Sequence, residues 1–144
     1  MTWFESKRIV VPFDFSNECI EAVKVALKLA ESEDNVHVLH VLIDLLEAHP
    51  YSLPDETAAE HRKSRARESM QERLGHLGLR NVHLDVGIGN PGAIVADLAK
   101  EINAGLIVIP SHGRSGVKRL LLGSVAERVV RLAPCPVLVL KRGH

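Results

Sequence analysis

Residues 110–124 carry the kinds of groups that bind anions in proteins. Two glycines, Gly113 and Gly123, border a short polar stretch, and Ser124 and Glu127 have the spacing of a capping box. This spacing predicts a helix that begins at Ser124 and turns its free N–H groups toward the stretch. The stretch holds three cations, Arg114, Lys118 and Arg119. A helix N-terminus beside glycines and cations is typical of a phosphate site.

The elements that must position this stretch alternate between strands and helices along the chain. Apolar runs predict strands at residues 8–12, 36–43, 82–86, 106–109 and 137–140. Helices are expected after Ser16 and Asn90 and over residues 55–77, and a loop over residues 44–53. Strands joined by crossover helices predict an α/β fold, in which helices cover both faces of a five-stranded parallel sheet in a three-layer α/β/α sandwich.

Size and charge limit the classes of function. With 144 residues, 46% of them hydrophobic, the chain fits one domain spanning residues 1–144. Its 18 Lys and Arg balance 18 Asp and Glu, so we expect no nucleic-acid partner. The first eight residues are charged and no apolar run approaches the roughly 20 residues that cross a bilayer, so we expect a cytoplasmic protein without membrane insertion.

The stretch before the last predicted helix resembles the G-x2-G-x9-G-[ST] signature of the universal stress protein superfamily, in its ATP-binding branch. Gly113, Gly123 and Ser124 occupy the last three signature positions, while Pro110 replaces the first glycine. The similarity extends along the chain to residues 11–16, 40–41 and 133–139. By this resemblance the chain is identified as a member of the family with an incomplete glycine signature.

The resemblance implies the strand order 3-2-1-4-5 of the adenine nucleotide alpha hydrolase-like fold. It further implies an ATP site, with Mg²⁺ as a possible companion of the nucleotide, where the carboxyl ends of strands one and four meet. The implied ligand-binding residues are Pro12, Asp14, Val41, Pro110, His112, Gly113, Arg114, Gly123, Ser124 and Val125. Antiparallel pairing of residues 137–140 with a second copy is implied as well, because this strand would lie at a sheet edge.

Several of these residues have two possible roles. Ser124 could contact a phosphate or only cap its helix. The carboxylate of Asp14 could accept hydrogen bonds from ligand hydroxyl or amino groups, or only stabilise the turn before Ser16. Pro110 removes an N–H donor and adds a ring, which weakens nucleotide binding if both face the ligand and changes little if they face the sheet edge. His112 is expected to line the same cleft.

Other motifs indicate no further chemistry. Residues 87–92 spell G-x-G-x-x-G, but they follow a late strand and lack the acidic residue about 20 positions on, so we interpret them as a tight connection. The histidines show no metal-ligand spacing, and we assign Cys19 and Cys135 no chemistry. We find no catalytic residue and expect at most slow ATP hydrolysis.

Two functions follow. The first is a regulatory protein that binds ATP and acts as a nucleotide-dependent switch read by a protein partner, whose identity the residues do not indicate. The alternative is a nucleotide-free homodimeric interaction module in the stress response, for which Pro110 is the argument.

Overall fold

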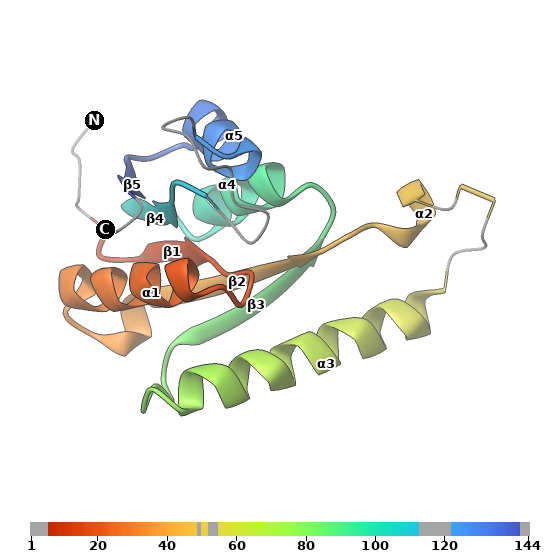
Figure 1. Cartoon of the computed structure of the whole chain (residues 1–144), viewed down its shortest axis with the longest axis horizontal. Helices are drawn as coiled ribbons and strands as arrows, with labels where there is room; N and C mark the ends of the chain where they lie inside the picture. Colours follow the sequence, from red (N-terminus) through yellow and green to blue (C-terminus); the bar gives the residue numbers. More distant parts are fainter. Residues whose placement is uncertain (1–5, 49, 52–54, 113–121, 142–144) are drawn as a thin grey trace.

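The computed structural model describes residues 6–48, 50–51, 55–112 and 122–141. Within them, five parallel strands form one sheet in the order β3-β2-β1-β4-β5 (Figure 1). The strands are β1 (Ile9–Pro12), β2 (Val36–Leu42), β3 (His83–Ile88), β4 (Leu106–Pro110) and β5 (Val137–Leu140). This order confirms the prediction and places β1 and β4, whose connections leave in opposite directions, side by side at the centre of the sheet.

Helices cover both faces of the sheet, as predicted. The helices are α1 (Asn17–Ala30), the 3-10 turn η1 (Glu33–Asn35), α2 (Leu45–Ala48), α3 (Glu56–Gly75), α4 (Pro91–Glu101) and α5 (Ser124–Leu132). Buried side chains of α1 and α3 share one apolar cluster with the sheet, and those of α4 and α5 share a second cluster. In Figure 1, α3 runs alongside the outer strand β3.

Local sequence accounts for most helix starts. The Ser16 hydroxyl accepts the Cys19 N–H at 3.2 Å, and the Asp55 carboxylate accepts the Ala58 N–H at 3.0 Å. Asn90 caps α4, with Pro91 as its first residue. Each cap satisfies an N–H that the first helical turn leaves without a backbone partner.

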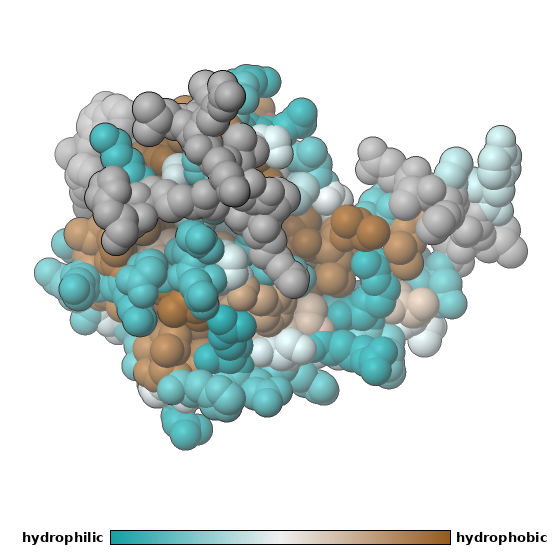
Figure 2. Space-filling view, viewed as in Figure 1, coloured by the Kyte–Doolittle hydropathy of each residue, from teal (hydrophilic) through white to brown (hydrophobic). Residues whose placement is uncertain are grey.

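The segment after β2 differs from the loop expected over residues 44–53. Residues Leu45–Ala48 form the short helix α2, because Asp44 accepts the Leu46 N–H at 2.9 Å and so starts a helical turn. Ile43 is 64% exposed there, and Leu45 and Leu46 are exposed too. Figure 2, in the same view as Figure 1, shows apolar brown atoms at the surface where β2 leads toward α2.

Gly92, the last glycine of the G-x-G-x-x-G motif, allows α4 to pack closely on α5. A Cβ at this position would lie 2.6 Å from the Cβ of Arg128. Gly87 likewise allows α4 to approach the sheet, since a Cβ there would lie 2.6 Å from Ile94. These two glycines therefore serve helix packing, which agrees with the interpretation of the motif as a connection.

We expect Gly92→Ala to lower the free energy of unfolding by about 1–3 kcal/mol, because the new methyl group overlaps the Arg128 side chain where it leaves α5. Urea unfolding followed by circular dichroism measures the change. Gly75→Ala is the matched control: nothing lies within 4 Å of its Cβ position in α3, so stability should stay equal or rise by up to about 1 kcal/mol. Equal stability of the two variants would contradict the close packing of α4 on α5.

Candidate functional site

The hydrogen-bonded pairing of β1 with β4 stops before the strands end. Ile9 pairs with Leu106 and Val10 with Ile107, and these described strands form no later pair. On their other sides, by contrast, the pairing continues to the strand ends. Pro12, the last residue of β1, pairs with β2, and Pro110, the last residue of β4, pairs with β5. The carboxyl halves of the two central strands are thus free to diverge.

Two prolines explain why the pairing stops. Successive residues of a strand turn their N–H groups to opposite neighbours. The Phe13 N–H donates to β2 at 2.7 Å and the Ser111 N–H donates to β5 at 2.9 Å. Residues 12 and 110 therefore face the gap between β1 and β4, and as prolines they have no N–H to bridge it. The missing N–H of Pro110 thus faces this gap, and not the β5 side of β4.

A cavity of about 420 Å³ opens where the two strands diverge. Eight of the ten residues expected at a ligand site line it: Pro12, Asp14, Val41, Pro110, His112, Gly123, Ser124 and Val125. The other two, Gly113 and Arg114, lie outside the described residues. The eight residues come from two parts of the sequence, residues 12–41 and 110–125, and together they surround one space.

The apolar lining of this cavity was not predicted from the sequence. Phe13, Leu39, Val95 and Ile109 line it and belong to the buried core. Nothing local distinguishes them from other core residues, because which apolar side chains border a cavity depends on where the strands diverge. They give the cavity an apolar surface suited to a flat, hydrophobic group.

Asp14 stabilises the turn before Ser16 and also lies at the cavity, while its contact with a ligand stays a prediction. Its Oδ1 accepts the Ser16 N–H and the Cys19 thiol, each at 3.0 Å, and its side chain also lines the cavity. The turn is set by Phe15, whose φ of 67° is unusual for a residue with a side chain. The Phe15 ring packs edge-on against His40. Turn chemistry therefore holds the carboxylate in place at the cavity.

The start of α5 corrects the predicted capping box. Gly123, not Ser124, is the N-cap residue, and because glycine has no side chain it provides no side-chain cap. The Gly123 N–H donates to the Ser111 carbonyl at 2.8 Å, which fixes the N-cap one residue before Ser124, while Ser124 is the first helical residue, as predicted. Glu127 pairs with Arg131 at 2.6 Å and does not fold back onto the helix start. No carboxylate from this helix therefore blocks an anion there.

The uncapped helix leaves three backbone donors at the cavity. The first hydrogen bond within α5 joins the Glu127 N–H to the Gly123 carbonyl. The N–H groups of Ser124, Val125 and Ala126 therefore have no partner within the helix, and all three residues line the cavity. Free N–H groups and the positive end of the helix dipole favour an anion at this end.

The end of β1 offers the cavity hydrogen-bond acceptors. The Asp14 side chain lines the cavity, and the Pro12 carbonyl receives no N–H from residue 110 because that residue is proline. The lining thus combines acceptors after β1, donors at the start of α5 and apolar side chains. A ligand with hydroxyl or amino groups, an anion and an apolar part matches this lining.

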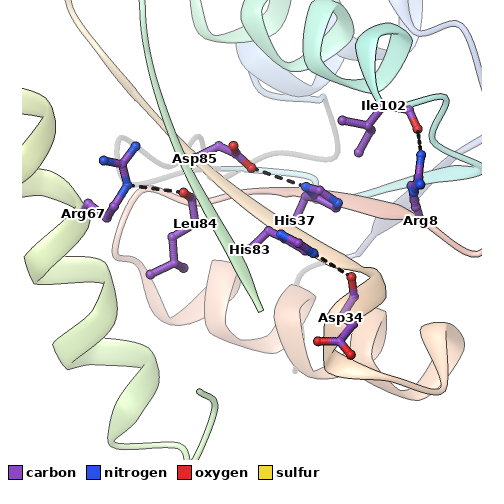
Figure 3. Close-up of polar contacts among 8 residues, drawn as sticks. All are labelled: Arg8, Asp34, His37, Arg67, His83, Leu84, Asp85 and Ile102. Atoms are coloured by element: carbon purple, nitrogen blue, oxygen red, sulfur yellow. Dashed lines mark hydrogen bonds and ion pairs between the residues drawn. The ribbon is translucent and has the colours of Figure 1, made fainter. Parts of the chain in front are cut away.

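A second polar cluster lies at the amino-terminal ends of β2 and β3, away from the cavity (Figure 3). His37 stacks on His83 with ring centroids 4.2 Å apart and lies 3.4 Å from the Asp85 carboxylate. His83 donates to the Asp34 carbonyl at 2.9 Å. Among the described residues no group of three or more His, Cys, Asp or Glu side chains could hold a metal ion, so this cluster is an arrangement of paired side chains.

Of the helices that the structure describes, none is long and apolar enough to span a membrane.

Sequence comparison supports the family that the signature indicated. Residues 5–141 match the universal stress protein family, and the chain belongs to that family. Universal stress protein MJ0531 of Methanocaldococcus jannaschii is 35% identical over 145 aligned residues, which cover 94% of this chain and 82% of the relative.

Solved structures confirm the fold. Universal stress protein UspA from Lactobacillus plantarum superposes with a TM-score of 0.71 at 26% identity, covering 94% of this chain and 97% of that one. The hypothetical protein MJ0577 also has a TM-score of 0.71, at 27% identity, covering 96% and 98% of the two chains. The sandwich is therefore of the adenine nucleotide alpha hydrolase-like type, as the resemblance implied.

Cys19 provides a test of the Asp14 turn. Burial, and next the hydrogen bond to Asp14, raise the pKa of the Cys19 thiol from 9.0 to about 12. Because only the thiolate reacts, alkylation by iodoacetamide at pH 8 should be roughly a thousandfold slower than for a thiol with the unperturbed pKa. Its rate should rise with pH, as measured by mass spectrometry of the Cys19 peptide.

Urea-unfolded protein serves as the control for this labelling, because there Cys19 should react as fast as Cys135. Labelling of Cys19 in the native protein at its unfolded rate would contradict the buried thiol and its hydrogen bond to the carboxylate.

Proposed function

We propose that this universal stress protein binds an adenine nucleotide, ATP in the first place, in the cavity between β1, β4 and α5 and acts as a nucleotide-dependent switch. The observation that carries the proposal is a single cavity lined by acceptors after β1, free N–H groups at the start of α5 and apolar side chains. A nucleotide has ribose hydroxyls, phosphates and a flat base, and each part matches one of these kinds of lining.

Each region would hold one part of the nucleotide. The N–H groups of Ser124, Val125 and Ala126 would meet the phosphates, and Asp14 would accept hydrogen bonds from ribose hydroxyls. Val41, near the end of β2, would form part of the apolar wall for adenine. Any Mg²⁺ would be held chiefly by the phosphates, as this ion usually is when few protein ligands are present. Gly113 and Arg114 are further candidates for phosphate contact from the sequence alone.

A route for the switch runs from the phosphate end to the sheet edge. Ser111 accepts the N–H of Gly123, the N-cap of α5, and donates its own N–H to Leu140 of β5. A phosphate that shifts the start of α5 would therefore act on Ser111 and through it on the end of β5. No catalytic base was identified in the sequence, so regulation through binding is favoured over turnover.

Thermal unfolding of nucleotide-stripped protein tests the proposal. ATP at about 100 times its dissociation constant should stabilise the fold by roughly 2.7 kcal/mol and raise the Tm by several degrees, with GTP as the control.

The variant Ser124→Pro tests whether the start of α5 binds the phosphates. Proline is well tolerated as the first helical residue, and Gly123 already has the extended conformation that must precede it.

Because Ser124→Pro removes one free N–H and one hydroxyl but keeps the helix, the affinity for ATP should fall about tenfold while the affinity for adenosine stays unchanged. The matched variant Ser124→Ala removes the hydroxyl alone and separates the two contributions. Absence of any ATP-specific shift in the wild-type Tm would overturn the proposal, and equal ATP affinity of Ser124→Pro and wild type would exclude the start of α5 as the phosphate end.

The second candidate is a nucleotide-free homodimeric interaction module, and Pro110 favours it. Its missing N–H and its ring both lie at the cavity, so one backbone donor that glycine would offer a ligand is absent.

Under either function we propose a homodimer. Within this chain β5 pairs only with β4 along the described strands, and an apolar edge strand of this kind is normally covered.

The variant Val139→Pro tests the dimer. The carbonyls of residues 136 and 140 face β4, so the N–H of residue 139 points to the free edge, where proline is tolerated by the sheet but cannot pair with a second copy. We expect the variant to sediment as a monomer at micromolar concentration where the wild type sediments as a dimer. Val139→Thr keeps the N–H and should remain dimeric; a monomeric wild type would overturn the proposed pairing.

A further inference from the structure

The segment that follows β2 exposes a group of apolar side chains. Ten large hydrophobic residues are exposed in the described part of the chain, and four of them lie within residues 43–51. Ile43 is 64% exposed, Leu45 41%, Leu46 40% and Tyr51 100%. Single exposed apolar residues are normal on a protein surface, whereas a group of neighbours is typical of a contact surface.

The amino-terminal part of α3 lies beside this segment and has no core beneath it. Met70 and Leu74 are the buried residues of α3, so residues 56–69 bury no side chain. Arg62 donates through Nη2 to the Ile43 carbonyl at 3.2 Å, which holds the helix next to the exposed apolar residues. In Figure 1, α2 and the start of α3 extend beyond the sheet on the same side of the molecule. Both are therefore accessible to another molecule.

This part of α3 is rich in cations. Residues 61–67 read His-Arg-Lys-Ser-Arg-Ala-Arg and contain no carboxylate. Arg62 and Arg65 are three positions apart, so they are neighbours on one side of the helix. Lys63 pairs with Glu60 at 3.8 Å, whereas neither of these two arginines forms an ion pair with a described residue. Figure 2 shows hydrophilic atoms over this part of α3 next to the apolar atoms where β2 leads toward α2.

The combination of apolar and cationic groups favours an acidic segment of another protein. The two arginines would pair with its carboxylates, and Ile43, Leu45 and Leu46 would cover its large apolar side chains. The Asp44 carboxylate between them is engaged with the backbone of α2, because its Oδ1 accepts the Leu46 N–H at 2.9 Å. The cations are therefore the side chains that select the charge of the partner.

Other occupants match this surface less well. A second copy would meet it through an isologous contact, in which the arginines of one copy lie against those of the other. Nucleic acid would use the cations alone and leave the apolar residues exposed, and the chain balances 18 Lys and Arg against 18 Asp and Glu. A helix that lies on a bilayer needs an apolar face, whereas residues 56–69 carry no apolar side chain larger than alanine.

We propose that Ile43, Leu45, Leu46, Arg62 and Arg65 form a docking surface, the α2–α3 surface, for an acidic segment of a partner protein that carries large apolar side chains. None of these five residues lines the cavity. Docking therefore goes beyond nucleotide binding and does not require it. Burial of the apolar side chains supplies affinity, and the arginines reject neutral and basic segments.

Fluorescence anisotropy of labelled synthetic peptides, titrated with the full chain in the absence of nucleotide, tests this proposal. Two probes of about 15 residues consist of glutamate and leucine, one with leucine at every third or fourth position for a helix and one with alternating leucine for a strand. We expect one of them to bind with a dissociation constant on the order of 10–100 µM, and more weakly at high salt. Replacing its glutamates by glutamine, or its leucines by serine, should weaken binding at least about tenfold.

Exposed positions allow variants that test the surface without disturbing the fold. Arg65→Glu and Leu45→Ser should each weaken binding of the peptide about tenfold or more. Lys28→Glu and Leu29→Ser in α1 are the matched controls, because both residues are exposed, Leu29 by 48%. The control variants should keep the affinity within about twofold of wild type. Thermal unfolding of all four variants verifies that they are folded.

Failure of both probes to bind, or equal affinity for their glutamine or serine forms, would overturn the inference. Unchanged affinity of Arg65→Glu, or an equal loss in the α1 controls, would overturn it as well. If duplex DNA or phosphatidylglycerol vesicles bind in place of the peptides and Arg65→Glu abolishes that binding, the surface recognises a different anion and the inference is wrong. The Tm shift with ATP is measured separately, so failure of the docking surface and failure of the nucleotide site are distinguished.

Discussion

The pairing between β1 and β4 at the centre of the sheet is short, and the geometry of the cavity depends on this. Up to Val10 and Ile107 the strands are joined by backbone hydrogen bonds. Beyond them, two residues that face the gap are prolines and cannot donate. In a sheet, a missing hydrogen bond between two inner strands leaves polar groups to be satisfied elsewhere. Here the hydrogen bonds are lost between the two strands whose connections leave in opposite directions. Parallel α/β sheets bind ligands at this position.

The polarity of the cavity lining comes from backbone geometry more than from charged side chains. Its donors are N–H groups that the first turn of α5 cannot use, since the N-cap residue Gly123 has no side chain to cap them. Its acceptors include a carboxylate already held by Ser16 and Cys19. A carboxylate fixed in this way needs little ordering on binding, which favours a specific orientation of the ligand.

The position of Ser111 connects the cavity with the edge of the sheet. One residue bonds both to the N-cap of α5 and to the last residue of β5, so the two elements share a support. The short backbone hydrogen bonds on either side of Ser111 make this support stiff compared with a contact between long side chains. In a regulatory protein, such a connection lets the occupancy of a cavity influence an edge at which a second chain could pair.

The sequence by itself determined the order of the elements, the parallel sheet with helices on both faces, and the eight described residues that line the cavity. The elements follow from apolar periodicity and helix caps, whereas the eight residues follow from the resemblance to the family, whose signature spacing is kept despite the replacement of one glycine. The tertiary structure alone decided that Gly123 caps α5, because the contact of its N–H with Ser111 outweighs the local preference of Ser124 for the cap position. It alone also decided the hydrogen bond from Cys19 to Asp14, the burial of His112 and the apolar lining, since each depends on residues from separate elements approaching one another. Local preferences set where an element begins within a residue or two, whereas contacts between distant segments set which groups are left free to meet a ligand.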